Sequence, residues 1–508
     1  MSLKTQTIKN VSSSWMSLLV NGIVGFFLAP FIIHHLGDDA YGLWILIYSI
    51  TGSYGLFDLG IRSSVVRYVS KFHALGDRAE LSRLLSTTLF AYSIVGLIAT
   101  AVTVFGAIYL DRIFHIPPGF VHTARLLFLM VGLSLALDFP LGIGGGVLDA
   151  LQKFYLANLT RLASSVLRAI LIVIALSRGK GLITLGLITV VLPLIASGVR
   201  VFMAVRALPV PISARYINRN TLRQMAGYSS ATLIIMVAAR LRFRTDAMVI
   251  GAFLSAAAIT MFSIGSRLVS FATDIVVSLA EVFTPMASQF EARKDLQALQ
   301  RMFVLGSRAC GMVMFPCTVI LVVLGKSVIR VWVGQRYVAD AYPVLLILVL
   351  ATTLWTSQAT SGRVLMGTGR HKTMALVVLI EGIANLVLSI VLVKPYGIVG
   401  DALGTAIPLA ITSIFFLPQY LCSTLGVPVL QFLRQAYLAP LLCSFPLALT
   451  LAVLNSLFPT PSYPTLVLEM AIGIIAYGLC LLAMLAIRRP PVTGFGTRVL
   501  QLLSRSEF

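Results

Sequence analysis

Residues 70–83 read SKFHALGDRAELSR, and residues 288–301 read SQFEARKDLQALQR. Identical residues recur between these two stretches at a constant offset of 218, namely Ser70/Ser288, Phe72/Phe290, Ala74/Ala292, Asp77/Asp295, Leu81/Leu299 and Arg83/Arg301. Further along, Gly145 matches Gly362, and Val147-Leu148 matches Val364-Leu365, at an offset of 217. A near-constant offset over distant blocks indicates that the first part of the chain is repeated in the second.

The composition around these stretches is that of a membrane protein. Of the 508 residues, 58% are hydrophobic and only 11% are charged, whereas a soluble domain carries about 25% charged residues. The mean hydropathy is +0.95. There is too little polar surface for soluble domains, and disorder, collagen and disulfide scaffolds are also excluded. Because barrel strands are short and alternating, we predict an all-α polytopic membrane protein.

Apolar stretches long enough to cross a bilayer recur along the whole chain. A spanning helix needs about 20 apolar residues. The pattern predicts about fourteen spans, at 11–34, 41–66, 84–110, 121–149, 155–177, 182–206, 228–253, 257–284, 301–324, 341–366, 373–393, 398–421, 436–458 and 466–487. Residues 121–149 are the least regular, because Pro140 and several glycines interrupt them.

The repeat divides these spans into lobes. Each copy holds six spans, an even number, so both copies have the same topology and are related by a pseudo-two-fold axis along the membrane normal. We predict an N-lobe at 1–210, a C-lobe at 211–425, and two additional spans with a cytoplasmic tail at 426–508. Two lobes that face each other with substrate between them are typical of a transporter.

The net charge of +21 indicates the orientation. Lys and Arg are concentrated in the loops on one side, and the minority on the other side are Arg112, Arg178, Lys180, Lys326, Arg330, Arg336 and Lys394. The richer side faces the cytoplasm by the positive-inside rule. We therefore expect both termini to be cytoplasmic and do not interpret the charge as a sign of nucleic-acid binding.

Several arginines lie inside predicted spans. The fifth span carries Asn158, Arg161, Ser165 and Arg168 on one helical face, and the seventh carries Arg240 and Arg244 on another. Facing lipid, four such arginines would cost on the order of 10 kcal/mol, so they more plausibly line a wet cavity. Because arginine grips phosphate with two hydrogen bonds, we expect an anionic substrate at these residues: Asn158, Arg161, Arg168, Arg240, Arg244 and Arg62.

Alternative roles for these arginines remain open. Arg161 could extend its side chain to the nearer interface, Asp246 could neutralise Arg242 at a spacing of four, and Asp58 could pair with Arg62 in the same way. Arginines of the seventh span could also pair with acids elsewhere.

Intramembrane acids are candidates for ion coupling, because a buried carboxylate can exchange protons. The candidates are Asp58, Asp138, Asp274, Glu281 and Glu381. Arg267, Asp274 and Glu281 follow each other at steps of seven, so this stripe is either a structural ladder or a proton relay.

The stretch His35 to Asp77 reads HLGDDAYGLWILIYSITGSYGLFDLGIRSSVVRYVSKFHALGD. It resembles the start of bacterial polysaccharide transporters, with the segments Leu36-Gly37, Tyr41 to Trp44, Asp58 to Ile61, Arg67 to Val69 and Gly76-Asp77 carrying the likeness. The resemblance implies the multidrug/oligosaccharidyl-lipid/polysaccharide exporter (MOP) superfamily, and within it the O-antigen-type flippases.

What this resemblance implies is a specific activity. Such proteins turn undecaprenyl-diphosphate-linked oligosaccharides from the inner to the outer leaflet of the bacterial cytoplasmic membrane by alternating access. The expected partners are the lipid-linked oligosaccharide, membrane lipids and a coupling ion, H⁺ or Na⁺, and a monomer is expected. The resemblance carries over no individual site residue.

Two other classes of function are weighed against this one. A Na⁺/H⁺-coupled multidrug exporter of the same fold would need a net acidic cavity. A glycosyl-transferring membrane enzyme would need a large external loop, and none is predicted, so we expect no enzyme and no cofactor. The five cysteines lack metal-ligand spacing, and His34-His35 with Asp38-Asp39 is interpreted as a solvated turn, with no metal site expected.

Overall fold

The computed structural model describes residues 3–58, 60–225, 245–458 and 460–487. These residues form helices and turns, and none of them lies in a β-strand. The first helices are α1 (Leu3–Leu36), α2 (Asp38–Gly52), η1 (Ser53–Asp58), α3 (Ile61–Ala74), α4 (Arg78–Ile113), η2 (Pro118–Phe120), α5 (Val121–Ala150), α6 (Phe154–Ser177), α7 (Leu182–Ala207) and η3 (Ala214–Tyr216).

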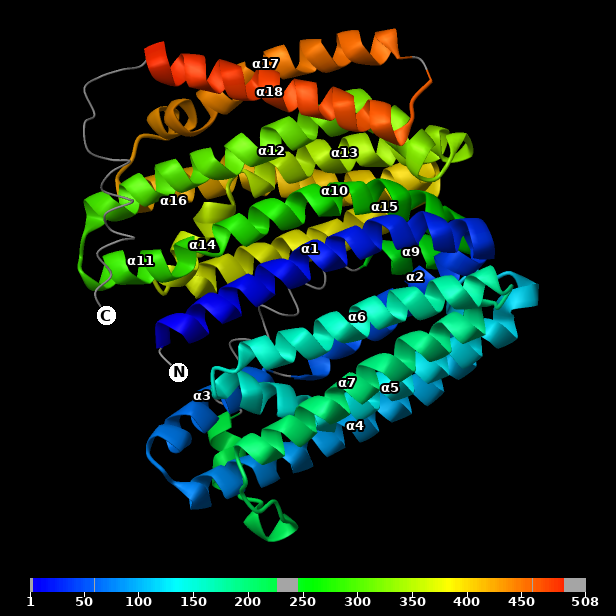
Figure 1. Cartoon of the computed structure of the whole chain (residues 1–508), viewed down its shortest axis with the longest axis vertical. Coiled ribbons are helices and arrows are strands. Elements are labelled where there is room, and N and C mark those ends of the chain that lie inside the picture. The colour runs from blue at the N-terminus through cyan, green and yellow to red at the C-terminus, as the bar shows by residue number, and fades with distance from the viewer. Residues whose placement is uncertain (1–2, 59, 226–244, 459, 488–508) are drawn as a thin grey trace. The chain divides into compact units, whose positions relative to one another are not determined.

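The later helices follow in the same order (Figure 1). They are α9 (Asp246–Phe253), α10 (Ala256–Ala280), α11 (Phe283–Ala292), α12 (Leu296–Trp332), η4 (Gln335–Tyr337), α13 (Val338–Thr356), α14 (Ala359–Gly367), α15 (His371–Ile411), η5 (Thr412–Phe416), α16 (Leu417–Leu425), α17 (Val429–Leu457) and α18 (Tyr463–Ile487). The prediction of an all-α membrane protein is confirmed.

The described helices account for most of the predicted spans. Eleven of them are long and apolar enough to cross a membrane, or twelve if the bent pair Asp38–Asp58 and Ile61–Ala74 counts as one span. Helix α15 contains two predicted spans, which meet at a non-helical residue, Gly397. The predicted seventh span, 228–253, lies mostly outside the described residues, so the total of fourteen stays a prediction.

The chain forms two compact units. The first contains Met1–Phe271, Trp332–Thr352 and Arg370–Thr412, and the second contains Ala272–Val331, Thr353–Gly369 and Ser413–Phe508. In the first unit, α5 packs against both α4 and α7, α6 packs against α1, and α9 packs against α15. In the second unit, α11 packs against α14 and α17 against α18. The lobe boundaries 1–210, 211–425 and 426–508 stay a prediction.

Both copies of the repeated stretch adopt the same local structure. Asp77 accepts a hydrogen bond from the main-chain N–H of Glu80 at 2.9 Å and so caps α4, and Asp295 caps α12 through Ala298 at the same distance. The residue before each cap, Gly76 or Lys294, has a positive φ. An N-cap side chain satisfies a donor that the first helical turn leaves without a partner. Identical residues therefore start equivalent helices.

A serine at the same repeat position also makes an equivalent contact in each copy. The Ser70 hydroxyl donates to the main-chain oxygen of Ala150, at the end of α5, at 2.9 Å. The Ser288 hydroxyl donates to the main-chain oxygen of Gly367, at the end of α14, at 3.1 Å. These bonds satisfy helix-terminal carbonyls that have no partner inside their own helix. The internal repeat is thus visible in the structure as well as in the sequence.

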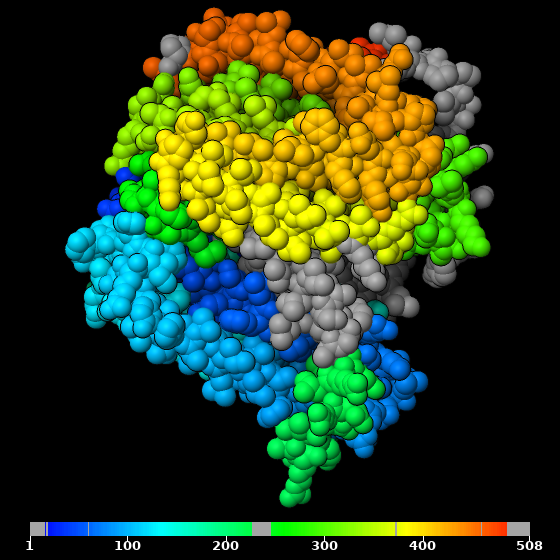
Figure 2. Space-filling model, turned by 180° about the vertical axis from the view of Figure 1, so that it is seen from behind, coloured from blue at the N-terminus to red at the C-terminus, as the bar shows by residue number. Residues whose placement is uncertain are grey.

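Helix α15 illustrates how the apolar surface is arranged. Its first arm exposes large apolar side chains along one stripe, which is composed of Leu376, Ile380, Ile383, Val387 and Val391. Figure 2 shows this segment, in yellow, at the surface. The opposite stripe contains Glu381, Asn385 and Ser389 at a spacing of four, and all three are buried. An apolar stripe that faces outward with polar groups inside is the pattern of a helix in lipid.

Candidate functional site

Three arginines approach one another near the ends of the first-unit helices that are predicted to be cytoplasmic. Arg62 begins α3, Arg161 lies in the first half of α6, and Arg200 lies near the end of α7. The side chains of Arg161 and Arg200 each experience the positive charge of Arg62, and Arg200 also experiences that of Arg161. The sequence predicted Arg62 and Arg161 for this role but not Arg200.

The surface between two of these arginines is formed by glycine. A Cβ atom placed on Gly145, in α5, would lie 3.5 Å from a terminal nitrogen of Arg62 and 3.8 Å from Nε of Arg200. On Gly144, a Cβ atom would collide with the backbone of α7, at 2.5 Å from the nitrogen of Val201. The glycines that made this stretch look irregular in sequence therefore allow α5 and α7 to pack closely and bring the two guanidinium groups near each other.

Two carboxylates partly neutralise the arginines. Asp149, near the end of α5, accepts from Arg62 at 2.7 Å, and its carboxylate also lies within electrostatic range of Arg161 and Arg200. Asp138 accepts a hydrogen bond from Ser197, whose hydroxyl in turn accepts from Arg200 at 2.6 Å. We name Arg62, Arg161, Arg200, Asp138 and Asp149 the arginine cluster. Its formal charge is +1, from three cations and two anions.

The expected pairing of Asp58 with Arg62 is not what the structure shows. Asp58 accepts a hydrogen bond from the Tyr92 hydroxyl at 2.5 Å, and Arg62 pairs with Asp149. The chain leaves the helical path between them, since η1 ends at Asp58 and Gly60 has a left-handed φ of 76°. Because a spacing of four places two side chains together only on a continuous helix, the predicted pair does not form.

Arg168 lies two turns beyond Arg161 on α6, in a different polar environment. One of its terminal nitrogens lies 3.5 Å from the Ser165 hydroxyl, which itself donates to Asn21 of α1 at 2.5 Å. The positive charge of Arg168 also acts on the hydroxyl of Tyr48, in α2. Asn158, on the same helix, is half-buried. The stripe predicted on the fifth span is therefore a continuous polar face of α6.

The other predicted residues lie elsewhere. Arg240 and Arg244 lie outside the described residues. In the second unit, Asp274 is exposed, and Glu281 is 67% exposed and lies 3.9 Å from Arg363. Glu381 is buried in α15 of the first unit. The structure therefore does not bring the five candidate coupling acids together.

A second polar cluster, which sequence reasoning missed, connects α9 and α15. Asn385 donates to the Thr405 hydroxyl at 3.1 Å, and Thr405 donates to the Asp246 carboxylate at 3.1 Å. Ser389 lies 3.3 Å from the main-chain oxygen of Asp401. Asp401 itself is fully buried, and within the described part of the chain neither of its carboxylate oxygens has a hydrogen-bond partner.

The two acids of this second cluster lie close enough for their charges to repel each other. An unpaired buried carboxylate is costly unless it binds a cation or a proton. We name Asp246, Asn385, Ser389, Asp401 and Thr405 the carboxylate cluster. Sequence reasoning assigned Asp246 to Arg242 and did not single out Asp401, although both acids lie within predicted apolar spans.

This combination of long apolar helices with internal cationic and anionic clusters defines a multi-pass membrane transporter. A family model described as polysaccharide biosynthesis protein matches residues 36–342. The chain therefore belongs to this family of polysaccharide biosynthesis proteins, as the resemblance in its first spans indicated.

Comparisons with individual proteins agree with this assignment. A protein of Salmonella typhi described as an O-antigen transporter is 22% identical over 80% of this chain and 94% of its own length. Among solved structures, the lipid II flippase MurJ in an inward closed conformation superposes with a TM-score of 0.72 at 18% identity, over 93% of this chain and 98% of MurJ.

A second solved structure establishes the superfamily of the fold. An inward-facing multidrug resistance MATE transporter of the MOP superfamily superposes with a TM-score of 0.69 at 13% identity, over 82% of this chain and 98% of that one. The fold is thus that of the MOP superfamily, as predicted.

Proposed function

We propose that this protein is a flippase that moves an undecaprenyl-diphosphate-linked oligosaccharide from the inner to the outer leaflet by alternating access, for the synthesis of a cell-surface polysaccharide. It acts as a transporter and not as an enzyme. We place it in the bacterial cytoplasmic membrane, as a monomer with both termini in the cytoplasm, because of the excess of Lys and Arg in the loops on that side. The relatives described as an O-antigen transporter and a lipid II flippase support this assignment.

The arginine cluster is the observation that carries the proposal. Three guanidinium groups from three helices converge, and Asp138 and Asp149 balance only two of them. A diphosphate carries enough negative charge to bind such a group, and each guanidinium can donate two parallel hydrogen bonds to phosphate. A cationic drug would instead be repelled, so this cluster favours the flippase over a multidrug exporter.

Binding of undecaprenyl diphosphate tests this proposal directly. The purified protein is titrated with undecaprenyl diphosphate or with uncharged undecaprenol, and the melting temperature is followed. We expect the diphosphate to raise the melting temperature and undecaprenol to have little effect. Arg161→Ala and Arg200→Ala should lose this response, whereas Arg178→Ala, at the exposed end of α6, should keep it. Equal stabilisation by both lipids would contradict the proposal, as would export of ethidium from an expressing strain.

The carboxylate cluster supports a finer proposal, that transport is coupled to a monovalent cation, Na⁺ or H⁺, at Asp246 and Asp401. The hydroxyl of Thr405 and the amide of Asn385 add neutral oxygens, which are the kind of ligand that hard cations prefer. A bound cation or proton would offset the repulsion between the two buried carboxylates.

The choice of ion is measured by the thermal stability of the protein in NaCl, KCl and choline chloride at equal ionic strength. A rise in melting temperature that is specific to Na⁺ and absent in Asp246→Asn and Asp401→Asn indicates sodium. If stability and transport depend on pH but not on Na⁺, the ion is the proton. Insensitivity of both variants and the parent to Na⁺ and to pH would contradict coupling at this site.

A further inference from the structure

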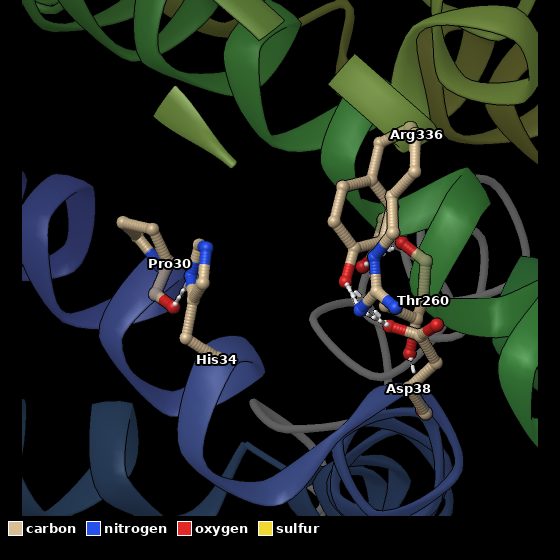
Figure 3. A network of polar contacts seen from close by, with 7 residues as sticks. Pro30, His34, Asp38, Thr260 and Arg336 are labelled. Atoms are coloured by element: carbon tan, nitrogen blue, oxygen red, sulfur yellow. Dashed lines mark hydrogen bonds and ion pairs between the residues drawn. The ribbon is translucent and has the colours of Figure 1, made fainter. Parts of the chain in front are cut away.

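Asp38, the first residue of α2, is the centre of a hydrogen-bond network that Figure 3 shows. The sequence indicated that this turn is solvated and faces the outside. In the structure, its residues contact two elements that are distant in the chain, α10 and η4. Asp38 belongs to the predicted N-lobe, whereas α10 and η4 belong to the predicted C-lobe.

Three donors from the predicted C-lobe converge on this one residue. The Tyr337 hydroxyl donates to the Asp38 carboxylate at 2.6 Å, and Arg336 donates to the same oxygen at 3.1 Å. The Thr260 hydroxyl donates to the main-chain oxygen of Asp38 at 2.7 Å. Both the side chain and the backbone of Asp38 are therefore held.

The three donors differ in their exposure to water. Tyr337 and Thr260 are almost completely buried, and Arg336 is 62% exposed. A hydrogen bond from a buried donor to a carboxylate is strong because water does not compete for it, whereas an exposed ion pair is weak and screened by salt. The Tyr337 bond therefore contributes more to this network than the Arg336 ion pair.

Close packing on the same side accompanies the network. A Cβ atom on Gly42, one turn into α2, would lie 1.8 Å from the main-chain oxygen of Ala256, so only glycine lets α2 approach the start of α10 this closely. The main-chain N–H of His115 also donates to the main-chain oxygen of Gly251 at 2.9 Å. The neighbouring histidines are not involved, because Nδ1 of His34 and of His35 contacts a main-chain oxygen of α1.

We propose that Asp38 is the acceptor of a latch that holds the external ends of the two predicted lobes together, and that release of Tyr337 and Arg336 from Asp38 opens the transporter to the outside. This inference rests on the proposed function, since a latch has a role only in alternating access. Rocking of two lobes requires that contacts on one side form as those on the other break.

Spin labels on either side of the network report its opening. His35, beside Asp38, and Ala339, just after Tyr337, are exposed and make no contact in the latch. Cysteines at these positions, in a background without the five native cysteines, carry the labels in lipid nanodiscs, and the distance distribution is measured by pulsed electron paramagnetic resonance. We expect a dominant short distance in the parent protein.

Asp38→Asn should raise the ratio of a longer distance to the short one about tenfold, the change expected from weakening one hydrogen bond to a charged group by about 1.4 kcal/mol. Tyr337→Phe should have a larger effect than Arg336→Gln, because the tyrosine is buried. Raising the salt concentration should reduce the difference between the parent and Arg336→Gln, but not the effect of Tyr337→Phe.

Asp111→Asn is the matched control. Asp111 pairs with Arg125 at 2.6 Å on the same predicted side, but this pair joins α4 to α5 within one predicted lobe. Its loss should leave the distances unchanged. The latch is wrong if Asp38→Asn and Tyr337→Phe both retain the parent distribution, or if Asp111→Asn shifts it equally. The measurement needs no substrate, so a negative result here is distinct from a failure to bind undecaprenyl diphosphate.

Discussion

The guanidinium of Arg62, at the start of α3, lies 2.7 Å from the carboxylate of Asp149, near the end of α5. Arg62 is nearly half exposed and Asp149 is mostly buried, so solvent screening limits the stability that the pair supplies to about 0.5–1 kcal/mol. A double-mutant cycle of Arg62→Gln and Asp149→Asn, followed by thermal unfolding, should give a coupling energy of this size. The reversed pair, Arg62→Asp with Asp149→Arg, should restore stability but not transport, because Arg62 also faces the substrate. Restored transport would assign Arg62 a purely structural role.

Gly145 should tolerate only a small side chain without loss of transport. A Cβ atom there would be in ordinary contact with Arg62 and Arg200, so Gly145→Ala should be mild, whereas Gly145→Leu should displace both guanidinium groups. Transport by Gly145→Leu should fall at least about tenfold at equal expression, if one charged contact to the substrate is lost. Gly142→Leu, on the same helix, is the control, because nothing lies within 4 Å of its added Cβ. Equal loss in both variants would indicate a general defect of α5.

Thr405→Val should destabilise the protein by about 1–3 kcal/mol, because it removes the donor to the buried Asp246 carboxylate while keeping the shape of the side chain. Thermal unfolding of the purified variant measures this loss. Thr412→Val is a suitable control, since its hydroxyl only donates to a carbonyl of its own helix. If the two variants lose the same stability, the Thr405 hydroxyl has no special role beside Asp246.

Asp77→Ala and Asp295→Ala should each destabilise the protein by about 1 kcal/mol, the usual value of a helix N-cap. The expected losses are equal because the two caps have the same geometry in the two copies of the repeat. Glycine at either position should cost only a few tenths of a kcal/mol. A clear difference between the two alanine variants in thermal unfolding would show that the copies contribute unequally to stability.

Much of this structure follows from hydropathy and the repeat, because both depend on local patterns. Apolar stretches of sufficient length must become helices in lipid, and the identity of Asp77 with Asp295 correctly indicated equivalent helix starts. Pro140 looked like a break, yet it lies inside the continuous helix α5, where packing against α4 and α7 outweighs its local effect.

The sites were predicted less completely, because they depend on contacts between distant residues. Arg200 and Asp149 lie at the ends of spans, where charges are ordinary, and only the packing of α5 against α7 reveals that they join Arg62. Asp401 and Thr405 lie on a different arm of α15 from Asn385. The turn that brings these arms together depends on Gly397, whose positive φ of 58° cannot be inferred from hydropathy.

This turn at Gly397 has a consequence for the biogenesis of the protein. The arm before it contains Asn385 and Ser389, and the arm after it contains Asp401 and Thr405, which contact each other. Each arm alone would present these polar groups to hydrocarbon as it left the translocation channel, whereas the paired arms satisfy several of them mutually. The two arms should therefore enter the bilayer as one helical hairpin during synthesis, with the polar residues already paired.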